Sequence, residues 1–209
     1  MSLLFDYWIK RERKLESVGG WARAWAKRLV CLPSLMRTVC QMWNIRRRGG
    51  LIGRFTFLSP VRLNGSPQNF EIGDFCFVGR TFINLQDQIV IGNHVCINDG
   101  VTLFTASHDV RDPLWTQVSS PIRIADYVWI ASNAIILPGV SIGWGAVIGA
   151  GAVVAKNVPA RAIATGNPAT IREGIRSGTL DYSPEAFLAT RRAWLGSKVD
   201  VGSTSHSTQ

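Results

Sequence analysis

Long apolar runs are missing from this chain of 209 residues. The longest stretch of low polarity, residues 146–155, is about half of the roughly 20 residues that a membrane-spanning helix needs. Residues 1–14 alternate apolar and charged side chains too quickly to form the apolar segment of a secretory signal. Because 46% of the residues are hydrophobic and only 18% are charged, the chain can bury a core. We therefore expect a cytoplasmic protein of one domain with short appendages.

Cysteine and histidine are also scarce. The four cysteines never form a C-x-x-C pair, which predicts neither a zinc site nor a disulfide framework but free, buried thiols: Cys31, Cys40, Cys76 and Cys96. There are three histidines, and only two of them lie in the body of the chain, so the three imidazoles of a typical catalytic zinc are missing and we expect no metal. The chain also lacks a phosphate-binding G-x-x-x-x-G-K-[ST] loop, a dinucleotide-binding G-x-G-x-x-G turn and a nucleophilic G-x-S-x-G elbow.

What the chain does contain is a repeat of six residues. Every sixth residue from Ile124 to Val154 is aliphatic, and every sixth residue from Ile122 to Ala152 is apolar and of modest size. A period of six fits neither an α-helix nor a plain strand. It fits a chain that makes a short strand, turns and repeats, with three such units closing one triangular coil. We predict an all-β core, a parallel β-helix of about five coils over residues 66–159.

The flanks of the repeat predict the rest of the organisation. Ser183 and Pro184 are typical of a helix start, as N-cap and first helical residue, and we expect that helix to end near Leu195. The predicted segments are a basic helical N-terminal segment (1–50), the β-helix domain (51–165), a C-terminal extension with a short helix (166–195) and a disordered polar tail (196–209).

Basic residues outnumber acidic ones, 23 to 14, for a formal net charge of +9. Residues 1–48 hold eleven of the basic and three of the acidic residues, so this segment carries +8 and the remainder only +1. Its Trp and Leu residues recur at roughly helical spacing over residues 20–45, with Pro33 as an interruption. The segment could be an amphipathic element on a membrane surface, a helical cap over the first coil, or a nucleic-acid contact. The near-neutral body gives no support for nucleic-acid binding, which we do not expect.

The repeat is interrupted at a polar loop. Between Leu103 and Ile124 the register of six is lost over a stretch with two prolines, which predicts an excursion from the coil. His108 stands at the root of this excursion, and a neutral imidazole can remove a proton from a hydroxyl or amine as that group attacks. His108 is therefore the candidate general base. His94 is predicted as an exposed corner residue, and His206 lies in the tail.

Two stretches carry a resemblance to a known family. The run V-W-I-A-S-N-A-I-I-L-P-G-V-S-I-G-W-G-A-V-I-G-A-G-A-V-V-A-K-N-V-P-A, followed by G-N-P-A, resembles the hexapeptide-repeat acyltransferases. With T-A-S-H-D upstream, the chain is most similar to the sugar O-acetyltransferases of exopolysaccharide pathways, above all the colanic acid biosynthesis type. The match covers about residues 71–172, half of the chain. The resemblance implies a left-handed β-helix, a homotrimer with active sites at the subunit interfaces, and acetyl-CoA as the acyl donor.

Transferred to this sequence, the resemblance makes His108 the general base and Asn84 the active-site asparagine that helps to hold the acceptor or the histidine. An asparagine at a β-helix corner is also common for structural reasons. Asp109 and Asp112 could orient the imidazole, meet acceptor hydroxyls or cap the backbone of their own loop. Trp115 could stack on a sugar ring or pack against a neighbouring subunit.

The resemblance also assigns five donor-binding positions. Backbone amides at Ser132 and Ala150 would contact the pantetheine arm, with Ala155 and Lys156 nearer the nucleotide. Lys156 and Arg172 would supply charge-assisted hydrogen bonds to the phosphates of CoA. Ala155 departs from the family's usual threonine or serine, so a hydroxyl contact is lost there. At all five positions, ordinary coil geometry or a solvated charge is the alternative.

From these features we expect an acetyl-CoA-dependent O-acetyltransferase that modifies a sugar hydroxyl in polysaccharide biosynthesis. An N-acyltransferase acting on a nucleotide-linked amino sugar is the alternative on the same fold, and a non-catalytic β-helix scaffold or carbohydrate-binding module is the alternative of another class. The expected partners are a carbohydrate acceptor, free or lipid-linked, and the inner face of the membrane through residues 1–48.

Overall fold

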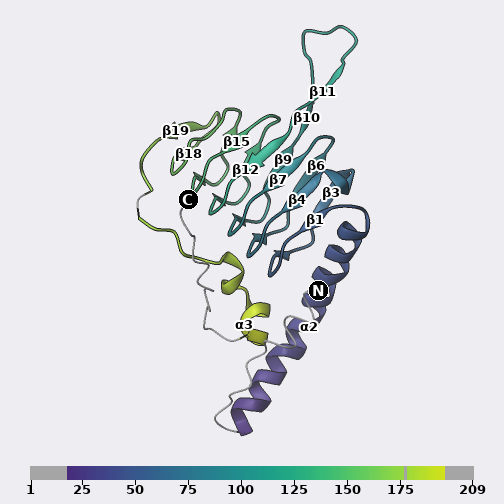
Figure 1. Ribbon diagram of the computed structural model, residues 1–209, viewed down its shortest axis with the longest axis vertical. Helices are drawn as coiled ribbons and strands as arrows, with labels where there is room; N and C mark the ends of the chain where they lie inside the picture. Colours follow the sequence, from purple (N-terminus) through teal and green to yellow (C-terminus); the bar gives the residue numbers. More distant parts are fainter. Residues whose placement is uncertain (1–17, 177, 196–209) are drawn as a thin grey trace, which may run out of the picture.

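The computed structural model describes residues 18–176 and 178–195. A parallel β-helix forms its centre, a long helix crosses one end of the coils, and a two-stranded hairpin projects from their side (Figure 1). Nothing in the described residues corresponds to the predicted tail, which lies outside them together with residues 1–17.

Three sheets make the three sides of the coil, and each holds one short strand per coil. Sheet A consists of β1 (Leu51–Ile52), β4 (Phe70–Ile72), β7 (Ile89–Ile91), β12 (Ile122–Ile124) and β15 (Ser141–Ile142). Sheet B consists of β2 (Phe57–Leu58), β5 (Phe77–Val78), β8 (Cys96–Ile97), β13 (Trp129–Ile130), β16 (Val147–Ile148), β18 (Ile163–Thr165) and the antiparallel β19 (Thr170–Arg172). Sheet C consists of β3 (Arg62–Gly65), β6 (Phe82–Leu85), β9 (Thr102–Phe104), β14 (Ile135–Ile136) and β17 (Val153–Val154).

The two predicted series of six form the core. All members of both series, Ile124 to Val154 and Ile122 to Ala152, are buried. Strands of successive coils pair in parallel so that equivalent residues stack, as Ile124 does with Ile142. Inward aliphatic side chains therefore stack into one continuous core, which confirms the parallel β-helix.

The β-helix has about six turns instead of the predicted five, and it begins at Leu51, the predicted start of the domain but earlier than residue 66, from which the coils themselves were predicted. The first coils are longer than three units of six: Leu58 pairs with Val78, and Val78 with Ile97. The intervals of 20 and 19 residues shift these coils out of phase with the repeat of six, and the sequence pattern did not reveal the first coil, which precedes residue 66.

The long helix α2 (Val18–Arg47) continues through Pro33, so the expected interruption there is wrong. Its second half lies on the first coil, where Leu35, Met42 and Ile45 join the core. Thr38 Oγ1 donates a hydrogen bond to the Leu58 carbonyl, 3.0 Å away. The interpretation of this segment as a cap over the open end of the β-helix is thus confirmed, because α2 covers apolar residues that the first coil would otherwise expose.

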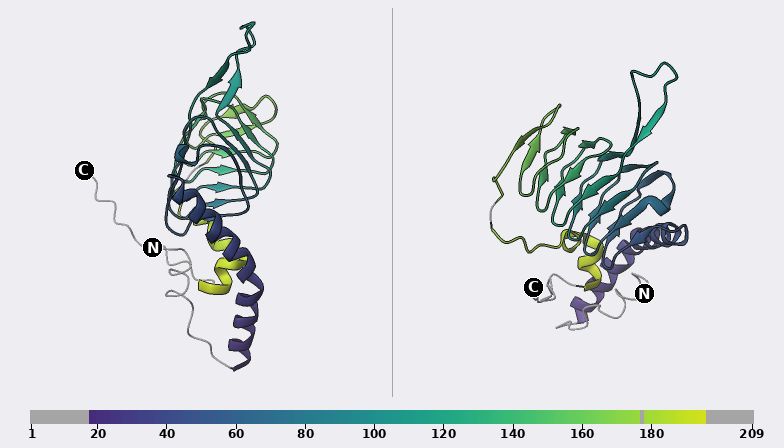
Figure 2. Two further views of the ribbon diagram at one scale, coloured as in Figure 1. Left: turned by 90° about the vertical axis from the view of Figure 1, so that its right-hand side faces the viewer. Right: turned by 45° about the horizontal axis from the view of Figure 1, so that its top comes forward.

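After β19 the chain runs back along the coils to α2 (Figure 2). The expected C-terminal helix is divided into a short 3-10 helix, η2 (Pro184–Phe187), and α3 (Ala189–Leu195), because Leu188 between them is extended. A second 3-10 turn, η1 (Pro67–Asn69), joins the first two coils. α3 packs against α2, and Arg28 Nε donates to the Ala193 carbonyl at 3.0 Å. Among the described residues, no helix is long and apolar enough to cross a membrane.

Candidate active site

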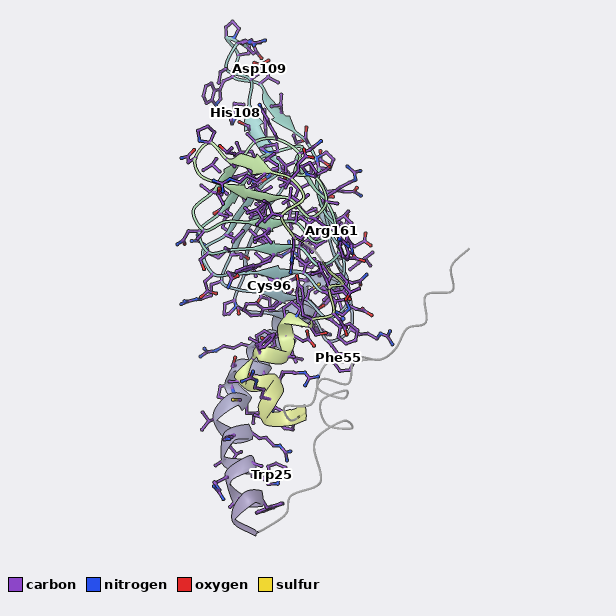
Figure 3. All side chains as sticks on the ribbon, turned by 90° about the vertical axis from the view of Figure 1, so that its left-hand side faces the viewer. Trp25, Phe55, Cys96, His108, Asp109 and Arg161 are labelled. Atoms are coloured by element: carbon purple, nitrogen blue, oxygen red, sulfur yellow. The ribbon has the colours of Figure 1, made fainter. Side chains whose placement is uncertain are left out.

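The predicted excursion is a β-hairpin that leaves the coil between β9 and β12. Strands β10 (Ala106–His108) and β11 (Gln117–Ser119) pair in an antiparallel manner, with His108 opposite Gln117. The two strands project well beyond the coils, and Figure 3 shows His108 and Asp109 on this projection, at the opposite end of the molecule from Trp25 of α2. His108 is exposed. The hairpin therefore presents the candidate base outside the solenoid wall.

The imidazole of His108 contacts Trp115 in two ways. Its Nδ1 lies 2.7 Å from the Trp115 carbonyl oxygen, and its ring stacks on the indole with centroids 4.8 Å apart and planes 20° from parallel. A carbonyl oxygen can only accept, so Nδ1 carries the hydrogen and Nε2 of the neutral ring is the unprotonated nitrogen. The predicted roles of Trp115, stacking on a sugar or packing on another subunit, did not include this contact with the base.

The acidic residues of the loop cap its backbone. Asp109 accepts a hydrogen bond from the amide of Arg111 at 2.9 Å. Asp112 accepts from the amides of Leu114, at 2.9 Å, and Thr116, at 3.3 Å. Hydrogen bonds from Thr116 and from the Leu114 amide lower the pKa of Asp112. Of the roles left open for these carboxylates, capping of the loop is the one that the geometry supports.

Asn84 reaches the root of the hairpin through Thr105. Asn84 lies on β6 in sheet C, and the buried Thr105 hydroxyl lies 2.8 Å from its carbonyl oxygen and 3.1 Å from its side-chain Oδ1. The same hydroxyl accepts from the Asp87 amide at 3.0 Å, and the Thr105 carbonyl accepts from the Ser120 amide at 2.8 Å. Thr105 thereby joins Asn84 to both ends of the hairpin. The sequence analysis did not single out Thr105, and its place in the T-A-S-H motif is the signal that could have identified it.

The predicted donor-binding residues fall on different corners. Ser132 and Ala150 lie at the corner between sheets B and C on successive coils, and the Gly151 amide donates to the Ser132 carbonyl at 2.9 Å. Ala155 and Lys156 are exposed at the corner between sheets C and A, the same corner from which the hairpin leaves. Sheet C thus separates Ser132 and Ala150 from Ala155 and Lys156.

Arg172 is set apart from these residues. It ends β19 and pairs with Ile163 in sheet B. A shallow groove of about 450 Å³ crosses sheet A instead, and none of the predicted site residues lines it. Within one chain, the structure therefore does not gather all the predicted positions into one pocket.

The thiols of the coil, Cys76 and the partly buried Cys96, are unsuited to nucleophilic chemistry. Burial raises the pKa of Cys76 to about 12 and that of Cys96 to about 11, so both stay protonated near neutral pH. The expectation that all four thiols are buried is correct for Cys76 only, since Cys31 and Cys96 are partly buried and Cys40 is exposed. In the described part of the chain, no three His, Cys, Asp or Glu residues come together as a metal site.

His94 lies at a corner of the coil, as predicted, but the expectation that it is exposed is wrong. Its half-buried ring stacks between those of Phe75, at 5.1 Å, and Tyr127, at 4.7 Å. Its Nδ1 lies 3.0 Å from the carbonyl oxygen of Tyr182 on the returning C-terminal segment. His94 therefore helps to fasten that segment along the corner between sheets A and B.

Comparisons with known proteins agree with the fold. Residues 121–156 match the family model described as bacterial transferase hexapeptide (six repeats). A galactoside O-acetyltransferase of Lactococcus lactis subsp. lactis (strain IL1403) is 33% identical over 157 residues, which are 71% of this chain and 75% of that protein. A protein of Escherichia coli (strain K12), provisionally named colanic acid biosynthesis acetyltransferase, is 35% identical over 136 residues, 64% of this chain and 74% of that one.

Among solved structures, the chain is similar to a hexapeptide-repeat acetyltransferase of Vibrio cholerae O1 biovar eltor, crystallised in complex with acetyl coenzyme A. The TM-score is 0.62 and the sequence identity 28%, and the match covers 85% of this chain and all of that one.

Proposed function

The chain belongs to the hexapeptide-repeat acetyltransferases, and we propose that it transfers the acetyl group of acetyl-CoA to a hydroxyl of a carbohydrate. The names of the two relatives support a carbohydrate acceptor in polysaccharide biosynthesis, and the acetyl-CoA complex of the Vibrio protein supports the donor. The observation that carries the proposed chemistry is the 2.7 Å contact between His108 Nδ1 and the Trp115 carbonyl oxygen.

In this mechanism His108 is the general base. Its unprotonated Nε2 accepts the proton of the acceptor hydroxyl as that oxygen attacks the thioester carbonyl. Backbone amides stabilise the oxyanion that forms on the carbonyl oxygen. When the C–S bond breaks, CoA leaves as a thiolate and takes up the proton that His108 has held. The high pKa values of Cys76 and Cys96 favour this direct transfer over an acyl-enzyme intermediate.

Asn84 is proposed to hold the acceptor or the histidine loop. Its Oδ1 already lies 3.1 Å from the Thr105 hydroxyl, so the amide NH2 is the group left to donate to a ligand. For acetyl-CoA, the acyl donor, we propose contacts with the backbone amides of Ser132 and Ala150, and contacts of Lys156 and Arg172 with its phosphates. Ala155 would contribute only a small side chain beside the donor.

We further propose a homotrimer in which each active site lies between two subunits. Ser132 and Ala150 lie across sheet C from the corner that carries His108. An acetyl-CoA molecule that contacts both this pair and a His108 side chain would therefore be enclosed by two chains. The hairpin also exposes Val110 and Leu114, whose side chains are 83% and 85% accessible. A neighbouring subunit would cover such apolar side chains. If the acceptor is lipid-linked, contact of residues 1–48 with the membrane would bring the enzyme to its substrate.

A panel of free and lipid-linked glycans, tested with acetyl-CoA and read by mass spectrometry, checks the proposal. We expect an added acetyl group on a sugar oxygen with the wild-type protein and not with His108→Ala. Acetylation of an amine in nucleotide-linked amino sugars would identify the N-acyltransferase alternative instead. If calorimetry detects no binding of acetyl-CoA, the scaffold or carbohydrate-binding alternative is correct.

A further inference from the structure

Helix α2 carries a second apolar face that the β-helix does not cover. Residues seven or eight positions apart lie on the same side of a helix. Four large side chains with this spacing are exposed, and we call them the outward face: Trp21 (55% accessible), Leu29 (63%), Met36 (42%) and Trp43 (60%). The face that packs on the coils consists of other residues, among them Leu35 and Met42.

The charge of α2 has one sign only. Its 30 residues contain six Lys or Arg and no Asp or Glu. Lys27 and Arg37 are exposed on the side of the helix away from the outward face, and Arg46 and Arg47 lie in its last turn. The guanidinium of Arg47 lies over the ring of Trp43, 5.2 Å from its centroid. The outward face is therefore flanked by a cation at Trp43, and the remaining cations make the helix as a whole positive.

We propose that the outward face of α2 binds the surface of an anionic lipid bilayer. Trp, Leu and Met side chains enter the boundary between headgroups and acyl chains, and Arg47, beside Trp43, meets a lipid phosphate, a contact worth about 1 kcal/mol near such a surface. The other cations of α2 add a longer-range attraction to the anionic surface. A second copy of the chain is a weaker candidate for this face, since two such helices would bring like charges together without a single acidic residue to pair them.

Membrane binding and acyl transfer use different ends of the molecule. The hairpin with His108 projects at one end of the long axis, and the first half of α2 extends beyond the coils at the other (Figures 1 and 3). The inference extends the membrane contact proposed above but does not depend on the chemistry of His108. Vesicle binding and acetyl transfer can therefore fail independently.

Cosedimentation of the full-length protein with vesicles tests the inference. Vesicles of phosphatidylcholine mixed with phosphatidylglycerol should bind the wild type, and added salt should weaken that binding because it screens the cations. Leu29→Ser combined with Met36→Ser should weaken binding about tenfold or more. Leu51→Ser combined with Ile175→Ser is the matched control, since both side chains are exposed apolar groups outside α2.

A second pair of variants tests the charge. Arg47→Gln should weaken binding by about fivefold at low salt, because it removes the cation beside Trp43. Arg62→Gln with Arg123→Gln, which removes two exposed cations of the β-helix, should leave it within about twofold. Thermal unfolding should be unchanged in all four variants, because each substituted side chain is solvent-exposed.

Three outcomes would overturn the inference. Binding to pure phosphatidylcholine as strong as to the anionic mixture would show that charge plays no part. Equal losses in the control variants would show that the outward face is not the contact. If instead the wild type does not bind vesicles and Leu29→Ser with Met36→Ser dissociates an oligomer in sedimentation analysis, the face belongs to a second copy of the chain.

Discussion

The imidazole of His108 lies against the indole of Trp115, with ring centroids 4.8 Å apart and Nδ1 2.7 Å from the carbonyl oxygen of the same tryptophan. One residue therefore sets both the tautomer and the plane of the proposed base. Trp115 has a φ of +56°, in the left-handed region that a bulky residue rarely adopts. Such a conformation costs on the order of 1–3 kcal/mol, and the rest of the hairpin must hold it.

Replacement of His108 should remove the chemistry and leave donor binding. We expect His108→Ala to lower kcat by about 10²–10⁴, the usual contribution of a positioned general base. A thiol-release assay with an identified acceptor measures kcat, and calorimetry measures the Kd for acetyl-CoA, which should not change. Turnover near that of the wild type would rule out His108 as the base.

Removal of the Trp115 ring tests whether it positions the imidazole. Trp115→Gly keeps the carbonyl and accepts the positive φ, so only the stacking is lost, and we expect kcat to fall by up to about tenfold at constant KM for acetyl-CoA. Trp115→Ala should be less stable than Trp115→Gly because alanine is strained at this φ. A raised KM for the acceptor with unchanged kcat would show instead that the indole binds sugar.

The Thr105 hydroxyl should matter for both stability and activity. Thr105→Val leaves the Asp87 amide and the Asn84 side chain without their partner, and we expect a loss of about 1–3 kcal/mol in the free energy of unfolding and a lower kcat. Thr105→Ser keeps the hydroxyl and is the control. If Val and Ser variants behave alike in denaturation and kinetics, the hydroxyl does not support the hairpin.

Two methionines on α2 distinguish the face that packs on the first coil from the outward face. Met42 is 2% accessible and Met36 is 42% accessible. Met42→Ala should reduce the free energy of unfolding by about 2–5 kcal/mol, because it leaves a cavity between α2 and the first coil. Met36→Ala should change it by less than about 0.5 kcal/mol. Chemical denaturation measures both, and equal effects would contradict the assignment of the faces.

Glu185 should make stability fall with rising pH. Burial raises its pKa from 4.5 to about 7, so between these pH values the folded chain holds a proton that the unfolded chain has released. The free energy of unfolding then decreases through this window, by about 3 kcal/mol in total. Glu185→Gln, which stays neutral, should remove that decrease and be more stable than the wild type at pH 8. Parallel curves of stability against pH for the two proteins would refute this role.

Much of the fold and part of the site could be predicted because they depend on local pattern. An inward side chain recurs at every sixth residue of a regular coil, so Ile124 to Val154 predicted the β-helix. The loss of that period after Leu103 predicted an excursion from the coil and singled out His108, although not that the excursion is a hairpin. The first coil, which lies 20 residues and not 18 before the second, gave no such pattern.

The sequence by itself determined the solenoid, its core and the position of the candidate base, since each follows from the order of apolar and polar residues. Only the tertiary structure decided that the Trp115 carbonyl holds His108, because that contact depends on the backbone angles of a loop. It alone decided which apolar face of α2 is buried, because helical spacing identifies both faces but not the one that meets the first coil. It also placed His94 under the returning C-terminal segment, a contact between residues nearly ninety positions apart.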